Sequence, residues 1–174
     1  MKLKQDHIEL KLLDESTLEL LRNWRNTSEI NQLMEHQAQI SKEQQLAWFN
    51  KLSKENNYYF IIYSDAIPIG MIHLSNLNGR YAESGMFIAE SEFKGTGIAF
   101  KASILLLDFA FEKLELEVIH AKVKNSNKVA QQYNQLLGFK IESKLSDAFS
   151  NWILSKEDYW LQREKIKKII RLTL

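Results

Sequence analysis

A glycine-containing turn before the most apolar segment is the feature that most constrains how this chain can fold. The turn contains Gly95 and Gly97, two of only six glycines among 174 residues. Apolar side chains then occupy most of the helical circumference over residues 97–114, which is typical of a central helix rather than a superficial one. Glycines at a helix start allow several N–H groups to face one point, where the helix adds partial positive charge. The pattern predicts a pyrophosphate-binding turn, although a tight strand-to-helix turn alone would need the same glycines.

The other segments alternate between strand and helix patterns and predict a mixed α/β fold. Strand patterns cover residues 8–13, 58–63, 67–74, 81–89, 118–123, 139–145 and 159–166. Helix patterns cover residues 18–26, 41–53, 97–114 and 126–137. Gly85 interrupts one strand and suggests a bulge or a close approach, while Trp152 falls in a polar loop before the last strand. With no internal repeat or linker, we expect one domain over residues 1–174, a central twisted mixed sheet of about seven strands with about four helices.

The balance of charges excludes several classes of partner. Lysine and arginine number 23 against 22 acidic residues, so the net charge of +1 gives no field for binding nucleic acid or an anionic membrane. No aliphatic run is long enough to span a bilayer. The chain has no cysteine, and its four histidines lack metal-ligand spacing. We therefore expect a cytoplasmic protein with no metal site, no nucleic-acid partner and no membrane partner.

A second motif follows the strand pattern at 118–123. Asn125-Ser126-Asn127 begins a helix that contains Tyr133 and is ended by Gly138. The order K-G-T-G-I-A, long helix, strand and N-x-N-x-x-A-x-x-Y-x-x-x-x-G-F resembles the GNAT superfamily of acetyl-CoA-dependent N-acetyltransferases. The family loop reads Q/R-x-x-G-x-G/A, and Lys94 stands in its first position. The similarity extends over about residues 8–166 and is strongest between residues 81 and 139.

This resemblance implies the GNAT fold, acetyl-CoA as cofactor, and a set of residues that bind it. In the family, pyrophosphate lies on the N–H groups of the turn, and the pantetheine arm lies between two splayed strands. The positions that match are Phe87, Ile88, Lys94, Gly95, Thr96, Gly97, Ile98, Ala99, Asn127 and Tyr133. Tyr133 matches the family tyrosine near the thioester sulfur, and a phenol can protonate a leaving thiolate. Without the motif, Tyr133 would be interpreted as an ordinary core tyrosine.

Acetyl transfer also needs a neutral amine, so we expect a proton acceptor near the splay. The position that sometimes carries a glutamate in the family is Lys122 here, and a lysine cannot easily fill that role. Glu83 is the leading candidate, because it shares a strand face with residues toward the cofactor end. His73 and His120 are alternatives, each able to relay a proton, and water chains could replace all three.

The N-terminal third resembles the PseH-type branch of the superfamily, which acetylates the 4-amino group of a nucleotide-linked amino-deoxy sugar. The resemblance lies in Leu21-Arg22-Asn23-Trp24-Arg25-Asn26, Trp48-Phe49 and Ala82-Glu83-x-Gly85. It implies a small-molecule amine as substrate, best a UDP-4-amino-4,6-dideoxy sugar of bacterial surface-polysaccharide or flagellin-glycan synthesis. An aromatic surface would receive the base and a cation the phosphates. The residues expected to contact this acceptor are Trp24, Arg25, Trp48, His73, Tyr81 and Glu83.

Three alternatives stay open at this stage. RimJ/RimL-type N-terminal acetyltransferases share the later motifs, so a protein N-terminus or another small amine is an alternative acceptor. A non-catalytic acyl-CoA-binding module on the same fold is a second alternative, since fold does not fix function. A binding or scaffold protein, in which the glycine loop is only a turn, is the third alternative. At the level of single residues, Trp24 and Trp48 could simply pack two helices onto the sheet. Exposed tyrosines and the expected C-terminal strand would allow a homodimer.

Overall fold

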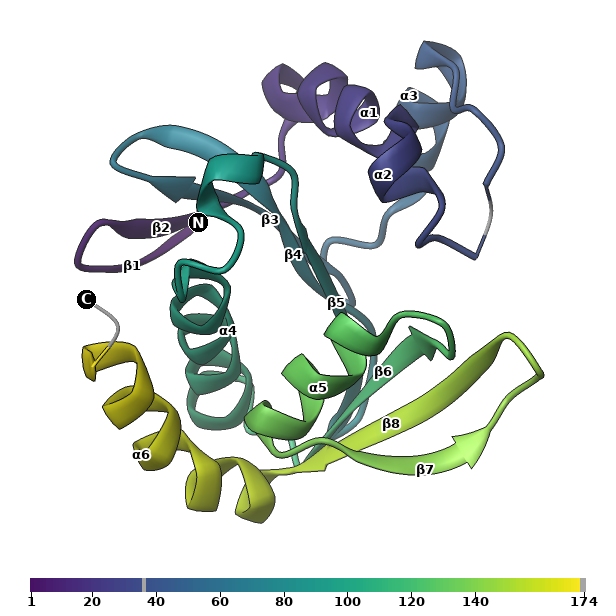
Figure 1. Cartoon of the computed structure of the whole chain (residues 1–174). Helices are drawn as coiled ribbons and strands as arrows, with labels where there is room; N and C mark the ends of the chain where they lie inside the picture. Colours follow the sequence, from purple (N-terminus) through teal and green to yellow (C-terminus); the bar gives the residue numbers. More distant parts are fainter. Residues whose placement is uncertain (36, 173–174) are drawn as a thin grey trace.

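The computed structural model describes residues 1–35 and 37–172, so His36, Thr173 and Leu174 lie outside the described residues. Within this part of the chain, eight strands form one mixed sheet in the order β1-β2-β3-β4-β5-β6-β8-β7 (Figure 1). The strands are β1 (Lys2–Gln5), β2 (Ile8–Leu12), β3 (Tyr58–Ser64), β4 (Ile67–Asn78), β5 (Tyr81–Ile88), β6 (Val118–Lys124), β7 (Lys140–Lys144) and β8 (Phe149–Ser155). The predicted mixed α/β class is confirmed.

Six α-helices connect and cover these strands. They are α1 (Leu18–Asn26), α2 (Ser28–Asn31), α3 (Lys42–Lys51), α4 (Ile98–Asp108), α5 (Lys128–Leu137) and α6 (Lys156–Leu172), and a π-helical turn (Phe109–Lys113) extends α4. Ser41 caps α3, as its sequence predicts, because its hydroxyl accepts from the Gln44 N–H at 3.2 Å and the Gln44 side chain accepts from the Ser41 N–H at 2.8 Å.

The two faces of the sheet carry different layers. Alternate residues of β4 and β5, such as Ile72 and Ala82, face α4 and α6 in the larger hydrophobic cluster. Their neighbours Met71 and Phe87 face α1 and α3 in the smaller one. Figure 1 shows α1, α2 and α3 grouped on one side of the sheet and α4, α5 and α6 on the other.

Strands β5 and β6 separate after a short parallel pairing. Only Tyr81–Glu83 pair with Val118–His120, although β5 continues to Ile88 and β6 to Lys124. The sheet therefore splays at this point, as the family resemblance implies. Gly85 does not mark a bulge, because β4 and β5 keep their register there. It instead makes room for a ring, since a Cβ at Gly85 would lie 2.8 Å from His73 Cε1.

The C-terminal segment contradicts the sequence prediction. The expected strand at 159–166 lies inside α6, and Trp152 lies in β8 rather than in a loop. Tyr159 and Ile166 are both buried and stand seven residues apart, a spacing that places them on one side of a helix. Trp152 and Leu154 are buried by the alternation of a strand. A helical spacing of apolar residues was thus mistaken for a strand, and β1 and α2 were missed.

These corrections bear on the expected partners. A homodimer through a C-terminal strand has lost its basis, because that segment is a helix and the sheet ends at β1 and β7. Among the helices of residues 1–35 and 37–172, none is long and apolar enough to cross a membrane.

Candidate active site

The glycine turn places main-chain donors at the start of α4. Gly95 and Gly97 have φ angles of 76° and 81°, a left-handed conformation that favours glycine. Gly97 is the N-cap residue of α4 and provides no side-chain hydrogen bond to the first turn. Thr96 stabilises the turn through a 2.8 Å hydrogen bond from its hydroxyl to the Phe93 carbonyl. The first N–H groups of α4 therefore face outward with helix-dipole charge behind them, which fits a pyrophosphate.

Lys94 at the entrance of this turn is engaged by another part of the chain. Its ammonium pairs with the carboxylate of Glu29 in α2. A phosphate bound at the turn would compete with Glu29 for this lysine. Ile98 and Ala99 begin α4, where Ile98 packs into the core and the Ala99 carbonyl faces Tyr133.

A cavity of about 390 Å³ lies at the splay of β5 and β6. Residues of α4 and α5 form one wall, and β4, β5, β6 and the segment 33–35 form the other. The predicted site residues that line it are His73, Glu83, Phe87, Asn127 and Tyr133. Those that do not line it are Trp24, Arg25, Trp48, Tyr81, Ile88, Lys94, Gly95, Thr96, Gly97, Ile98 and Ala99. The cavity therefore joins the predicted acid and the predicted base in one space.

Tyr133 is held firmly at the cavity wall. Its hydroxyl lies 2.9 Å from the Ala99 carbonyl oxygen, 2.6 Å from Ser103 Oγ and 3.3 Å from Met86 Sδ. Its ring packs against Phe100 with 4.6 Å between centroids. Burial raises the pKa of Tyr133 above its ordinary value, so the phenol keeps its proton at neutral pH.

Asn127 has a local structural role that is compatible with cofactor binding. Its side-chain oxygen caps α5 by accepting from the Ala130 N–H at 3.0 Å. Within residues 1–35 and 37–172 the Asn127 amide nitrogen forms no hydrogen bond, and the residue lines the cavity. On the opposite strand, Phe87 is buried and Ile88 is half-buried.

The three candidate bases differ in their surroundings. Glu83 lines the cavity. In the parallel pairing of β5 with β6 it stands opposite His120, at the last register position before the strands separate. Burial lowers the pKa of His73 to about 4, so its ring is neutral and weakly basic at pH 7. His120 lies toward β7 and β8, with Nδ1 3.3 Å from Asn151 Nδ2 and 3.5 Å from Glu142 Oε2. These positions favour Glu83.

The aromatic and cationic residues expected at the acceptor divide into two groups. Trp24 is only 7% exposed, packs edge-on against Phe87 and donates from Nε1 to Glu90 at 3.1 Å, so it belongs to the core. Trp48 is half-buried and carries the Arg25 guanidinium over its ring at 5.5 Å. Tyr81 is 51% exposed at the start of β5, away from the cavity lining.

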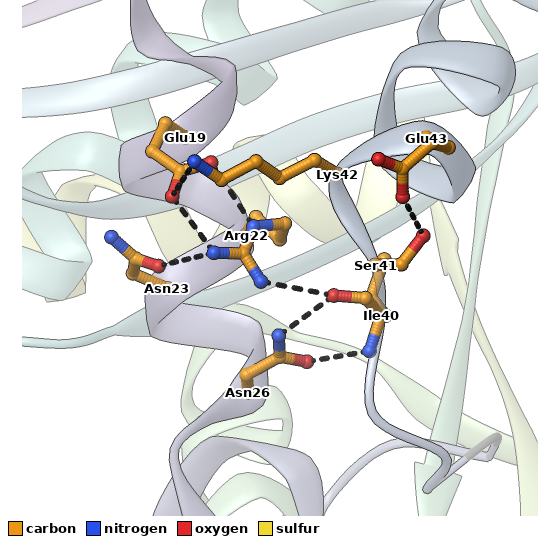
Figure 2. Close-up of polar contacts among 8 residues, drawn as sticks. All are labelled: Glu19, Arg22, Asn23, Asn26, Ile40, Ser41, Lys42 and Glu43. Atoms are coloured by element: carbon orange, nitrogen blue, oxygen red, sulfur yellow. Dashed lines mark hydrogen bonds and ion pairs between the residues drawn. The ribbon is translucent and has the colours of Figure 1, made fainter.

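Arg25 is placed by contacts between α1 and α3. Arg22 and Asn26 of α1 both donate to the Ile40 carbonyl, at 3.1 and 2.9 Å, while Asn26 Oδ1 accepts from the Ile40 N–H at 2.8 Å. Figure 2 shows these contacts between the two segments. This clamp fixes the start of α3 against α1. Arg25 then reaches Gln45 Oε1 at 3.5 Å, and burial lowers the pKa of its guanidinium.

Several contacts of the cavity residues were not predicted from the sequence. Lys122 of β6 pairs with Glu35 at 2.6 Å, and Lys124 donates to the Gln32 carbonyl at 2.8 Å. Both contacts hold the segment after α2 against the cavity. Their signal in the sequence is the alternation of polar residues along β6, whose partners 87 and 92 residues away could not be identified. Ser103 was also missed, although it is a polar residue inside an apolar helix.

Comparisons with known proteins show the family and the fold of this chain. The model of the acetyltransferase (GNAT) domain matches residues 7–140. Acetyltransferase PseH of Campylobacter jejuni (strain 81-176) is 31% identical over 125 residues, 71% of this chain and 77% of that protein. The crystal structure of Campylobacter jejuni PseH has a TM-score of 0.66 at 25% identity, covering 87% and 99% of the two chains. The Vibrio cholerae spermidine N-acetyltransferase in complex with CoA and spermine has a TM-score of 0.80 at 22% identity, covering 90% and 99%.

Proposed function

We propose that the acceptor of this enzyme is a nucleotide-linked amino sugar. The premise is that the chain belongs to the GNAT acetyltransferase family and is an acetyl-CoA-dependent N-acetyltransferase. The bond formed would join the acetyl group to the 4-amino group of an amino-deoxy sugar. The similarity to PseH supports this class of acceptor, and the charges around the cavity support it independently.

The observation that carries the proposal is the distribution of unmatched charge on the acceptor side. Among residues 1–35 and 37–172, neither Arg25 nor Lys124 has a carboxylate within ion-pair distance, whereas Lys122 is matched by Glu35. Lys124 lines the cavity, and Arg25 is close enough to His73 to help lower its pKa. An acceptor with one ammonium and a distant diphosphate would place its ammonium near Glu83 and its phosphates near these cations.

The other residues of the site fit the same reaction. The N–H groups after Gly95 and Gly97 would bind the pyrophosphate of acetyl-CoA. Glu83 would accept a proton from the sugar ammonium, and Tyr133 would protonate the sulfur that leaves. The half-buried Trp48, with the Arg25 guanidinium over its ring, would be the aromatic surface for the nucleotide base, while Trp24 would support this region from the core.

A polyamine is the second candidate acceptor. The Vibrio cholerae enzyme crystallised with spermine has the higher TM-score of the two neighbours, 0.80 against 0.66. Glu35 and Glu83 are two carboxylates on the cavity lining that could bind ammonium groups. The N-terminal amine of a protein substrate is the third candidate acceptor, an alternative that the sequence leaves open.

A panel of acceptors tests the proposal. Initial rates of CoA release would be measured with a UDP-linked 4-amino-4,6-dideoxy sugar, spermidine and a peptide with a free N-terminus. We expect kcat/KM for the sugar nucleotide to exceed the other two at least ~10-fold, and Arg25→Met to lower it by about 10-fold through loss of a charged hydrogen bond.

Arg80→Met is the matched control, because Arg80 pairs with Glu117 outside the cavity lining. It should leave the sugar-nucleotide rate unchanged. A higher kcat/KM for spermidine or for the peptide than for the sugar nucleotide would overturn the proposed acceptor.

A further inference from the structure

Ser103 is a buried hydroxyl on an otherwise apolar part of α4. It is 5% exposed, and its neighbours along the helix include Ala102 and Ile104, both buried. A serine inside a helix commonly bonds the carbonyl four residues earlier or faces solvent. Ser103 instead points across to α5, where its Oγ lies 2.6 Å from the Tyr133 hydroxyl oxygen. Both residues line the cavity.

The donors around the Tyr133 hydroxyl can be counted. A phenol has one proton, and the Ala99 carbonyl at 2.9 Å can only accept it. The thioether of Met86 at 3.3 Å is at best a weak acceptor. When the phenol proton points to Ala99, the Ser103 hydroxyl can donate to the phenolic oxygen, and its other acceptor is only the weakly accepting Met86 thioether at 3.4 Å.

The same count becomes decisive once the phenol has lost its proton. The phenolate then faces a carbonyl oxygen and a sulfur, neither of which can donate to it. Among the contacts of the described chain, the Ser103 hydroxyl is the one donor left for the negative charge. A hydrogen bond to a charged group is worth more than one between neutral groups, above all away from water.

We infer that Ser103 is a positioning residue for Tyr133. The Ser103 hydroxyl donates to the Tyr133 phenolate that remains after the leaving sulfur has been protonated. The inference rests on the proposed acid role of Tyr133. In that step the amine nitrogen bonds to the thioester carbonyl carbon, the carbon–sulfur bond breaks, and the sulfur takes the electron pair and the phenol proton. The acceptor ammonium loses two protons in all, one to restore Tyr133 and one to solvent.

The electrostatics of the pair agree with this assignment. Burial raises the pKa of Tyr133, and the hydrogen bond from Ser103 opposes that rise. A phenol without this serine would be a weaker acid in the same buried position. The pair thus keeps Tyr133 protonated at neutral pH while reducing the cost of giving up the proton.

Five variants of the full chain, one of them Tyr133→Phe alone, test the inference and are assayed with acetyl-CoA and the best acceptor of the panel. Ser103→Ala should lower kcat about 10- to 100-fold with little change in KM for acetyl-CoA, which is the effect of losing a charged hydrogen bond. Ser103→Thr keeps the hydroxyl and should restore most of the rate. In a Tyr133→Phe background, Ser103→Ala should cause no further loss. Ser64→Ala removes a buried serine of β3 outside the cavity lining and should leave kcat unchanged.

The outcomes separate this inference from the proposed function. An impaired Tyr133→Phe with a normal Ser103→Ala would overturn the role of Ser103 and leave the acid role of Tyr133 standing. A normal Tyr133→Phe would overturn both. A further loss from Ser103→Ala in the Tyr133→Phe background, or no recovery in Ser103→Thr, would show a packing role and reject the inference.

Discussion

The two sides of the splayed sheet are held by different kinds of interaction. Behind the cofactor side, Asp108 of α4 pairs with Arg163 of α6, and their side chains are only 19% and 18% exposed. On the acceptor side, Lys122 pairs with Glu35, whose side chains are 40% and 51% exposed. Water screens the second pair far more than the first. The comparison indicates a cofactor side fixed by buried contacts and an acceptor side that a ligand can rearrange at low cost.

The largest effect should come from the buried pair. Asp108 accepts two hydrogen bonds from Arg163, at 2.7 and 2.6 Å, and one from the Tyr159 hydroxyl at 2.6 Å. Asp108→Asn leaves Arg163 only the exposed carboxylate of Glu164 as a counter-charge, at 3.1 Å, and should lower the free energy of unfolding by about 3 kcal/mol. Urea denaturation measures this loss.

The control for this substitution is Asp147→Asn. It removes the charge of an aspartate in the same way, but from an ion pair with Lys144 in which both side chains are exposed. It should leave the urea midpoint nearly unchanged. Equal losses in the two variants would mean that burial does not distinguish the cofactor side, and the comparison would fail.

An intermediate effect is expected at His73, on the acceptor side. Its pKa is about 4 in the folded chain against an ordinary 6.5, because its ring is buried. Between these two values the unfolded chain binds a proton that the folded chain does not, so stability is complete above pH 6.5 and falls as the pH drops toward 4. Between pH 7 and pH 5 the loss from this residue should be about 1–2 kcal/mol.

Urea unfolding at both pH values separates this contribution from the rest of the chain. His73→Asn should lose less stability on acidification than the unsubstituted protein, with His7→Asn, in the turn between β1 and β2, as the comparison variant. An identical loss in His73→Asn and the parent protein would assign the acid sensitivity to other groups.

The cofactor side was largely predictable because its signals are local. Gly95 and Gly97 precede α4 directly, and both adopt the positive φ that their position in the sequence suggests. Asn127 begins α5 and Gly138 ends it, as each residue type favours. The order of these elements and their motifs resembles the GNAT family, and this resemblance was enough to predict the fold and acetyl-CoA as the cofactor.

The acceptor side was less predictable because its contacts depend on distant segments. Trp24 and Arg25 are adjacent, yet successive residues on a helix point about 100° apart, so one enters the core and the other reaches Trp48. Lys122 meets Glu35 only through the folded sheet. The C-terminal error has a different cause, because the seven-residue spacing of the buried Tyr159 and Ile166 is a local helical signal that was interpreted as a strand.

The smallest effect should come from the exposed pair on the acceptor side. Lys122→Met and Glu35→Gln each weaken an ion pair in contact with water, and each should change the free energy of unfolding by less than about 0.5 kcal/mol. Urea denaturation of both variants, beside Asp108→Asn, makes the comparison direct. A loss near that of Asp108→Asn would mean that the segment after α2 is fixed as firmly as α6. A small loss would mean that a ligand can displace this segment, which lines the cavity through Leu33, Met34 and Glu35, at little cost in binding energy.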